Sequence, residues 1–157
     1  MIRPLLLAVT ATAALATSLA AQDPRALQVS AQGGFVSTFT LADLDALEQV
    51  TITTTTIWTE GEVTFTGPSL SDVLEAAGSS GDVLTLTALN DYAIEMPAPA
   101  EGDPFPIVAT RLDGAPMSVR DKGPFWIVFP YDSDPAFQTE TIYAQSIWQL
   151  DRIEALD

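Results

Sequence analysis

The chain has 157 residues, with 21 acidic and six basic side chains, and its formal net charge at pH 7 is −15. This balance argues against binding to nucleic acid or to anionic membrane surfaces, because both require positive charge. The sequence contains neither cysteine nor histidine. That absence excludes disulfides, thiolate nucleophiles, serine–histidine–aspartate triads and zinc sites built on histidine.

The N-terminal segment has the pattern of a secretory signal peptide. Arg3 precedes an uncharged apolar run over residues 5–19, and the Ser-Leu-Ala at 18–20 fits the small-residue cleavage rule. We therefore expect a cleaved signal over residues 1–20 and one exported, periplasmic domain over residues 22–157, without membrane insertion. The alternative is a retained anchor, although the apolar run is shorter than the roughly 20 residues that span a bilayer.

The first part of the domain is predicted to form short strands and one helix. Alternating polar and apolar residues around Gly33-Gly34 predict two strands within 26–39. Thr40 as an N-cap, with Asp43 three residues later, predicts a short helix with Leu41, Leu44 and Leu47 on one face. β-branched residues over 50–57 predict the next strand.

The remaining elements follow from capping, turn and strand signals. Ser69 as a cap and Gly78 as a terminator predict a second helix, and Asp113-Gly114 predicts a hairpin turn. Further strands are expected over residues 62–66, 83–89, 92–96, 107–111 and 125–129, with a closing strand or turn over 142–157. The fold class predicted is therefore α+β, a single mixed domain of short strands with two or three small helices.

Five segments resemble, in order, the molybdopterin-binding domain of the sulfite-oxidase family. They are Phe65–Leu74 (against W-x-G-V-x-L-x-D-L-L), Asn90–Pro97 (D-G-Y…I-P), Ala109–Met117 (A-x-x-x-N-G-x-P-L), Gly123–Pro130 (G-x-P-x-R-L-V-V-P) and Ile147–Ile153 (V-K-W-L-x-x-I). No single segment is specific, but the ordered set covers most of the chain beyond the signal. The resemblance implies the pterin-domain fold of that family.

The departures from the family pattern concern the cofactor anchors. The family's molybdenum-binding cysteine would fall within Thr53–Thr56, and threonine supplies no thiolate. Trp126 replaces an arginine, Trp148 replaces a lysine, and Asp121-Lys122 occupies the region of a histidine. Losing cations weakens capture of an anionic phosphorylated cofactor, whereas tryptophan favours a flat, less charged heterocycle.

These departures resemble short, cysteine-free, exported relatives that bind a free pterin. The resemblance implies a non-catalytic periplasmic sensor whose ligand is a pterin, such as a tetrahydropterin, without molybdenum. Its implied partner is the periplasmic domain of a membrane receptor, either an enzyme that makes or degrades cyclic di-GMP or a histidine kinase. Two alternatives are a molybdopterin-dependent oxidoreductase without the usual cysteine and a module that kept the fold and lost the ligand.

Candidate ligand-binding residues fall into three groups, and each group has a structural alternative. Asn90, Asp91 and Tyr92 offer hydrogen-bonding groups for the 2-amino-4-oxo edge of a pterin, or form a turn. The basic residues Arg111, Arg120 and Lys122 attract a ligand, or pair with Asp113, Asp121 or Glu95. Trp58, Trp126 and Trp148 form a stacking wall, or belong to the core, with Tyr131 and Tyr143 as weaker candidates.

Overall fold

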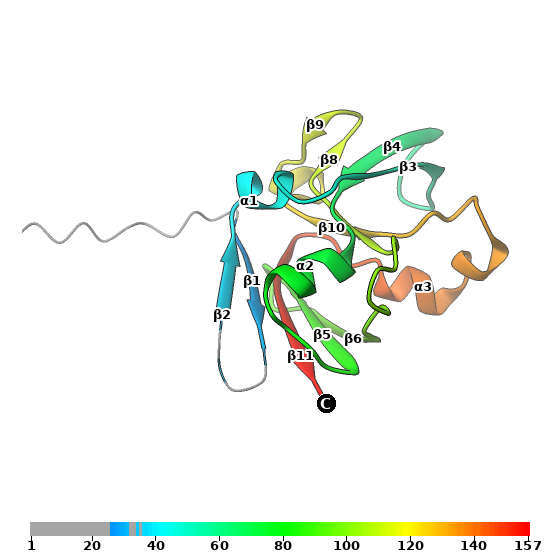
Figure 1. Ribbon diagram of the computed structural model, residues 1–157. Coiled ribbons are helices and arrows are strands. Elements are labelled where there is room, and N and C mark those ends of the chain that lie inside the picture. Colours follow the sequence, from blue (N-terminus) through cyan, green and yellow to red (C-terminus); the bar gives the residue numbers. More distant parts are fainter. Residues whose placement is uncertain (1–25, 32–33, 35) are drawn as a thin grey trace, which may run out of the picture.

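The computed structural model describes residues 26–31, 34 and 36–157. The predicted signal over residues 1–20, and Gly33 of the first predicted turn, lie outside these residues. The rest of the domain consists of short strands and small helices, as the sequence predicts (Figure 1).

The described residues form eleven strands and three α-helices. The strands are β1 (Leu27–Ser30), β2 (Val36–Phe39), β3 (Val50–Thr55), β4 (Glu62–Gly67), β5 (Val83–Ala88), β6 (Ala93–Pro97), β7 (Ile107–Ala109), β8 (Arg111–Leu112), β9 (Ala115–Pro116), β10 (Trp126–Val128) and β11 (Leu150–Leu156). The helices are α1 (Leu41–Asp45), α2 (Leu70–Ala76) and α3 (Glu140–Gln145), with 3₁₀ turns η1 (Val119–Asp121) and η2 (Pro135–Phe137).

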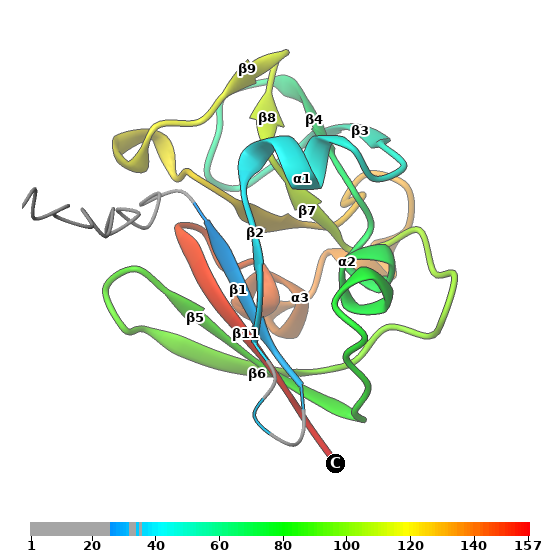
Figure 2. The same cartoon turned by 60° about the vertical axis from the view of Figure 1, so that its left-hand side comes forward.

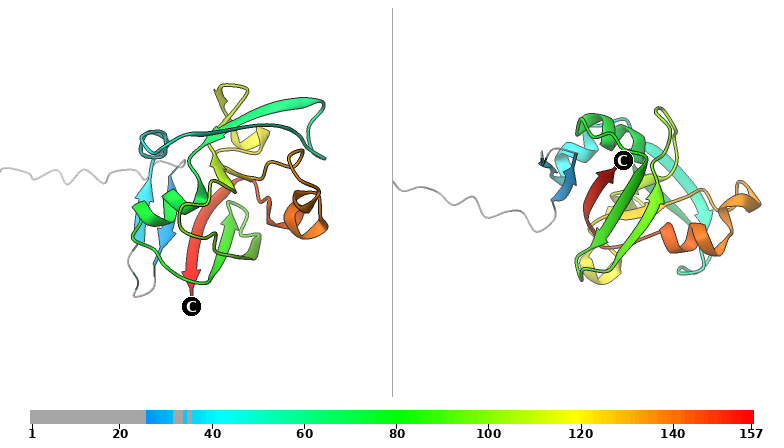
Figure 3. Two further views of the ribbon diagram at one scale, coloured as in Figure 1. Left: turned by 45° about the vertical axis from the view of Figure 1, so that its right-hand side comes forward. Right: turned by 90° about the horizontal axis from the view of Figure 1, so that it is seen from below.

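Three sheets stack into one domain. The order is β2-β1-β11-β5-β6 in the largest sheet, β3-β4-β8-β9 in the second and β10-β7 in the third. Strands β1 and β11 pair in parallel, and every other pairing is antiparallel. Figure 1 shows the two larger sheets at opposite ends with β10 and α2 between them, and Figures 2 and 3 show the same order from other sides.

The short strands β7 and β10 form the centre of the core. All six of their residues are fully buried. Because both faces of this pair are covered, its sequence is continuously apolar instead of alternating. The larger sheets contribute alternate residues to the same core, such as Leu27 and Val29 of β1 and Leu84 and Leu86 of β5.

The predicted caps and the predicted hairpin turn are confirmed. Thr40 and Asp43 form a reciprocal capping box at α1. The Ser69 hydroxyl accepts a hydrogen bond from the Asp72 amide at the start of α2. Asp113 and Gly114 both have left-handed backbone and connect β8 to β9, as a tight hairpin turn requires.

Two predicted elements differ from the structure. The strand expected over 107–111 divides at Thr110, because β7 pairs with β10 whereas β8 pairs with β4. The closing strand expected within 142–157 is confirmed as β11, but the same segment begins with most of α3, where no helix was expected. Thr139 caps α3 by accepting from the Ile142 amide, and a six-residue helix is too short for a clear apolar period.

Gly67 of β4 permits a close backbone approach to β7 of the third sheet. A Cβ atom at this position would lie 2.0 Å from the Val108 carbonyl oxygen. The adjacent Val108 amide donates to the Pro68 carbonyl at 2.8 Å, so the two segments cannot separate without losing this hydrogen bond.

We predict that Gly67→Ala lowers the free energy of unfolding by about 3 kcal/mol or more, because the added methyl group displaces backbone. Urea denaturation of both proteins measures this difference. The control is Gly61→Ala, where a Cβ meets nothing within 4 Å and φ is +67°, so only about 1 kcal/mol is expected from the backbone. Equal stabilities for Gly67→Ala and Gly61→Ala would contradict the close approach.

Candidate functional site

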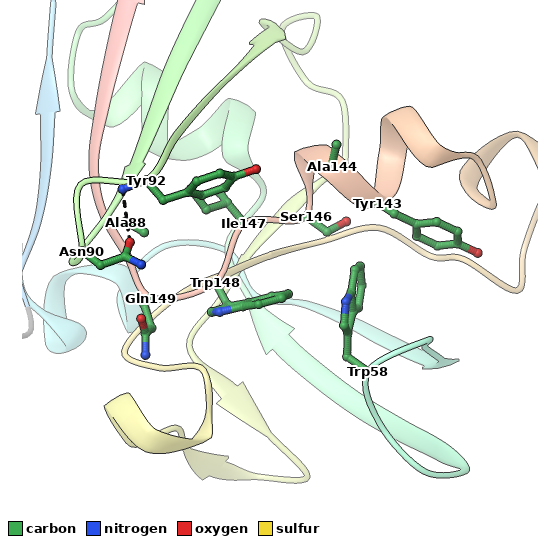
Figure 4. Close-up of a pocket in the computed structure, with 10 residues that line it drawn as sticks. All are labelled: Trp58, Ala88, Asn90, Tyr92, Tyr143, Ala144, Ser146, Ile147, Trp148 and Gln149. Atoms are coloured by element: carbon green, nitrogen blue, oxygen red, sulfur yellow. Dashed lines mark hydrogen bonds between the residues drawn. The ribbon is translucent and has the colours of Figure 1, made fainter.

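A cavity of about 350 Å³ opens where three connecting segments meet (Figure 4). Trp58 comes from the β3–β4 turn, Ala88 from the end of β5, and Asn90 and Tyr92 from the turn between β5 and β6. The other lining residues come from α3 and the segment after it. The lining residues are Trp58, Ala88, Asn90, Tyr92, Tyr143, Ala144, Ser146, Ile147, Trp148 and Gln149. The volume is in the range of small-molecule sites, and none of these residues is charged.

Trp58 is the centre of an aromatic cluster that forms one end of the cavity. Its ring centroid lies 5.7 Å from those of Tyr143 and Trp148, 5.8 Å from that of Trp126 and 6.0 Å from that of Tyr131. All four contacts are edge-to-face, the geometry that aromatic quadrupoles favour. In Figure 4 Tyr92 and Trp148 lie on opposite sides of the opening, with Asn90 and Gln149 at the end away from Trp58.

Ser146 connects this cluster to the backbone through buried hydrogen bonds. The Trp126 indole N–H donates to the Ser146 carbonyl at 3.1 Å, and the Tyr131 hydroxyl donates to Ser146 Oγ at 2.7 Å. Ser146 Oγ in turn donates to the Ile142 carbonyl at 2.8 Å. Burial raises the pKa of Tyr131 to about 12, so its hydroxyl remains a donor at neutral pH.

Asp132 fixes the end of β3, directly before the turn that carries Trp58. Its carboxylate accepts from the Thr55 amide at 2.6 Å and from the Thr55 hydroxyl at 2.8 Å. The Asp132 amide donates to Thr54 Oγ1 at 3.1 Å. These bonds join segments 77 residues apart. The two bonds from Thr55 hold the pKa of the Asp132 carboxyl below its usual value.

The structure brings four of the predicted ligand-binding residues to the cavity, namely Trp58, Asn90, Tyr92 and Trp148. Trp126 lies behind the wall with 0% of its surface exposed, and its ring contacts both Trp58 and Trp148. Asp91 faces Arg152, whose guanidinium donates to it at 2.8 Å.

The three predicted basic residues do not line the cavity. Arg111 forms two hydrogen bonds with Asp45 of α1, which is none of the acidic partners that the sequence suggested. This pairing, above all its hydrogen bonds, raises the pKa of Arg111 and lowers that of Asp45. The Lys122 ammonium lies 5.7 Å from the Trp126 ring centroid and 5.9 Å from that of Trp148. Arg120 is exposed in η1.

Sequence reasoning missed Ser146 and Gln149, and it ranked Tyr143 low. Ser146 carries no motif, because its importance comes from partners that are distant in sequence, such as Tyr131. Gln149 stands inside the last family-like segment, directly after Trp148. Its position in that segment is the signal that could have identified it.

The residues at the expected position of the family cysteine do not fit a molybdenum ion. Thr54 is buried, its hydroxyl donates to the Thr55 carbonyl and accepts from the Asp132 amide, and the Thr55 hydroxyl is bound to the Asp132 carboxylate. A threonine hydroxyl keeps its proton near neutral pH, unlike a cysteine thiol. Over the described part of the chain, no cluster of three histidine, cysteine, aspartate or glutamate side chains is placed to hold a metal.

None of the helices in the described residues has the length and apolar character needed to cross a bilayer.

The chain matches no protein-family model, and no curated protein matches it in sequence. Among solved structures it is similar to the sulfane dehydrogenase SoxCD from Paracoccus pantotrophus, with a TM-score of 0.61 and 16% sequence identity. The alignment covers 85% of this chain and 38% of the SoxCD chain, so the protein spans about two fifths of that neighbour's length. The likeness shows a distant sulfite-oxidase-like fold.

We predict that Asp132→Asn lowers Tm at pH 7, because an amide cannot accept both hydrogen bonds from Thr55. Because the pKa of Asp132 is lowered in the folded protein, its carboxylate stabilises the fold at pH values above the usual carboxyl pKa of 3.8. This stabilisation is lost as the pH falls through the lowered pKa. The difference in Tm between wild type and variant should therefore shrink on acidification below that value. Thermal unfolding from pH 7 to pH 3 measures it.

The control for this prediction is Asp82→Asn, whose carboxylate accepts no hydrogen bond from the described residues and should leave Tm at pH 7 unchanged. A Tm difference for Asp132→Asn that is constant across the pH range would contradict the role of the carboxylate.

Proposed function

We propose that the protein is a non-catalytic, periplasmic pterin-binding protein whose ligand status is transmitted to a membrane receptor. The cavity beside Trp148 carries this proposal. It combines aromatic rings on opposite sides with amide groups at one end. A pterin is a flat bicyclic heterocycle with a hydrogen-bonding edge, so stacking and edge recognition suit this cavity.

The absence of charge from the lining supports a free pterin over a phosphorylated one. No lysine or arginine belongs to the ten lining residues, and phosphate groups are normally bound by such side chains or by clusters of backbone amides. A neutral pterin, such as a tetrahydropterin, therefore fits the lining better than molybdopterin does.

The residues of the cavity support binding without chemistry. The serine of the lining, Ser146, has its hydroxyl engaged by Tyr131 and Ile142, and the sequence has no histidine to activate it. The competing hypothesis is a molybdopterin-dependent oxidoreductase, which the sulfite-oxidase-like fold suggests. Identifying the bound ligand and measuring molybdenum separate a pterin-binding protein from a molybdopterin-dependent oxidoreductase.

The receptor part of the proposal rests on the resemblance to short exported pterin-binding sensors. The partner proposed is the periplasmic domain of a receptor that controls cyclic di-GMP, or of a histidine kinase. Two aromatic side chains of the lining, Tyr92 and Trp148, are exposed at the surface. A bound ligand would alter this surface, and a receptor that prefers the loaded protein must also tighten ligand binding.

We predict that protein purified from a periplasmic extract releases a pterin on heating and contains no stoichiometric molybdenum. Mass spectrometry of the released ligand and elemental analysis measure the two. If the ligand is lost in purification, titration with 6-methylpterin and 6-methyltetrahydropterin replaces the first measurement. Stoichiometric molybdenum with a dithiolene pterin would overturn the binding proposal in favour of the oxidoreductase.

Trp148→Ala should weaken binding of these pterins by about tenfold to a hundredfold, because loss of a stacking ring costs about 1–3 kcal/mol per base-like ring. Trp148→Phe should restore part of the affinity. Leu156→Ala is a matched control, because Leu156 and Trp148 are both 37% exposed and Leu156 does not line the cavity. Equal affinities for Trp148→Ala and wild type would remove the stacking argument.

For the receptor, we predict that deletion of the gene abolishes the response of cellular cyclic di-GMP to added pterin. Wild-type protein should restore the response, and Trp148→Ala, exported to the same level, should not. Restoration of the response by both proteins would show that signalling does not require the cavity. Quantification of cyclic di-GMP in cell extracts provides the measurement.

A further inference from the structure

Two side-chain amides stand at the end of the cavity away from Trp58. Asn90 comes from the turn between β5 and β6, and Gln149 from the residue before β11 (Figure 4). The hydrogen-bond partners of each amide decide which of its atoms remains for a ligand.

The orientation of the Gln149 amide follows from its partner. Its Nε2 lies 2.7 Å from the Val119 carbonyl oxygen, which is an acceptor and therefore requires a donor there. The other atom, Oε1, receives no hydrogen bond from the described residues. In Figure 4 it lies on the side of the Gln149 amide that faces Asn90, and both residues line the cavity.

The Asn90 amide is oriented by the same logic. Its Oδ1 accepts from the Tyr92 amide at 3.1 Å, so Nδ2 is the atom that remains as a donor. In Figure 4 this nitrogen and the Gln149 oxygen both point into the space between the two side chains. The cavity therefore ends in one donor beside one acceptor, each fixed by a backbone group.

The backbone at this end adopts an uncommon conformation. Gln149 has φ of +54°, and Asp91 and Lys122, which flank the same end, have φ of +63° and +68°. The Gln149 amide donates to the Lys122 carbonyl, and the Gln149 carbonyl accepts from the Leu89 amide. Left-handed backbone is unfavourable for a residue such as glutamine, and it persists at ligand-binding sites where the surroundings impose it.

We infer that Gln149 is a specificity-determining residue of the cavity, whose Oε1 accepts a hydrogen bond from an N–H of the ligand. Together with Asn90 Nδ2 it selects ligands in which a donor adjoins an acceptor on one edge of a flat ring, as in an aminopyrimidinone. This inference rests on the proposed function and extends it from a ligand shape to a hydrogen-bonding pattern. The left-handed backbone at Gln149 places Oε1 at the end of the cavity. Glycine would adopt the same backbone conformation without strain but would supply no acceptor.

Three variants test this role, with 6-methylpterin and 6-methyltetrahydropterin as probes. Gln149→Gly removes the acceptor and relieves the backbone, so affinity should fall about tenfold while Tm is not lowered. Gln149→Glu keeps an acceptor oxygen but loses the hydrogen bond to the Val119 carbonyl that positions it, so its affinity should lie between those of wild type and Gln149→Gly. The control, Asp113→Gly, relieves left-handed backbone in the β8–β9 turn and should not change affinity.

Each outcome decides the inference. Wild-type affinity in Gln149→Gly would overturn the acceptor role. Equal losses in Gln149→Gly and Gln149→Glu would also overturn it, because the contact with the Val119 carbonyl would then be what matters. If Asp113→Gly lowered affinity as much as Gln149→Gly, the effect would come from placing glycine at a left-handed position and not from the acceptor, which would overturn the inference. If wild type binds neither probe, the proposed function itself fails and this inference fails with it.

Discussion

The buried hydrogen bonds of Ser146 are the constraint on which the cavity depends. A serine that is 1% exposed must satisfy its polar groups internally, and Ser146 does so with Trp126, Tyr131 and Ile142. These partners come from β10, from the segment after it and from α3. Removing any one would leave a buried donor or acceptor unpaired, at a cost of about 1–3 kcal/mol. The cavity wall is therefore held by hydrogen bonds and apolar contacts together.

The positions of the tryptophans explain why one fold has both a packed core and an open cavity. Trp126 is fully buried. Trp148 pairs with it through an isolated antiparallel β-bridge and stays partly exposed. Trp58 contacts both rings from a turn. A ligand that stacks on Trp148 would therefore rest on a surface supported from behind by the core. Such support limits the reorganisation that binding requires, and it makes the site more precise than an unsupported loop would be.

Much of the fold could be predicted from the sequence, because its signals are local. The caps at Thr40 and Ser69 and the turn at Asp113 depend on neighbouring residues alone, and all three are confirmed. The site was predictable only in part. Trp58, Asn90, Tyr92 and Trp148 carry resemblance or composition signals, whereas the partner of Arg111 proved to be Asp45, 66 residues away. Neither that pairing nor the bond from Tyr131 to Ser146 leaves a local trace, since each depends on how the sheets stack.

The end of β3 shows how hydrogen bonds hold one wall of the cavity. The resemblance places the family's cysteine within Thr53–Thr56, where a metal–sulfur bond would fix this strand end. Here Thr54 and Thr55 exchange three hydrogen bonds with Asp132, and two of these end on a carboxylate, which makes them stronger than bonds between neutral groups. The strand end stays fixed, and with it the turn that carries Trp58. Hydrogen bonds to Asp132 therefore set the position of the turn that carries Trp58.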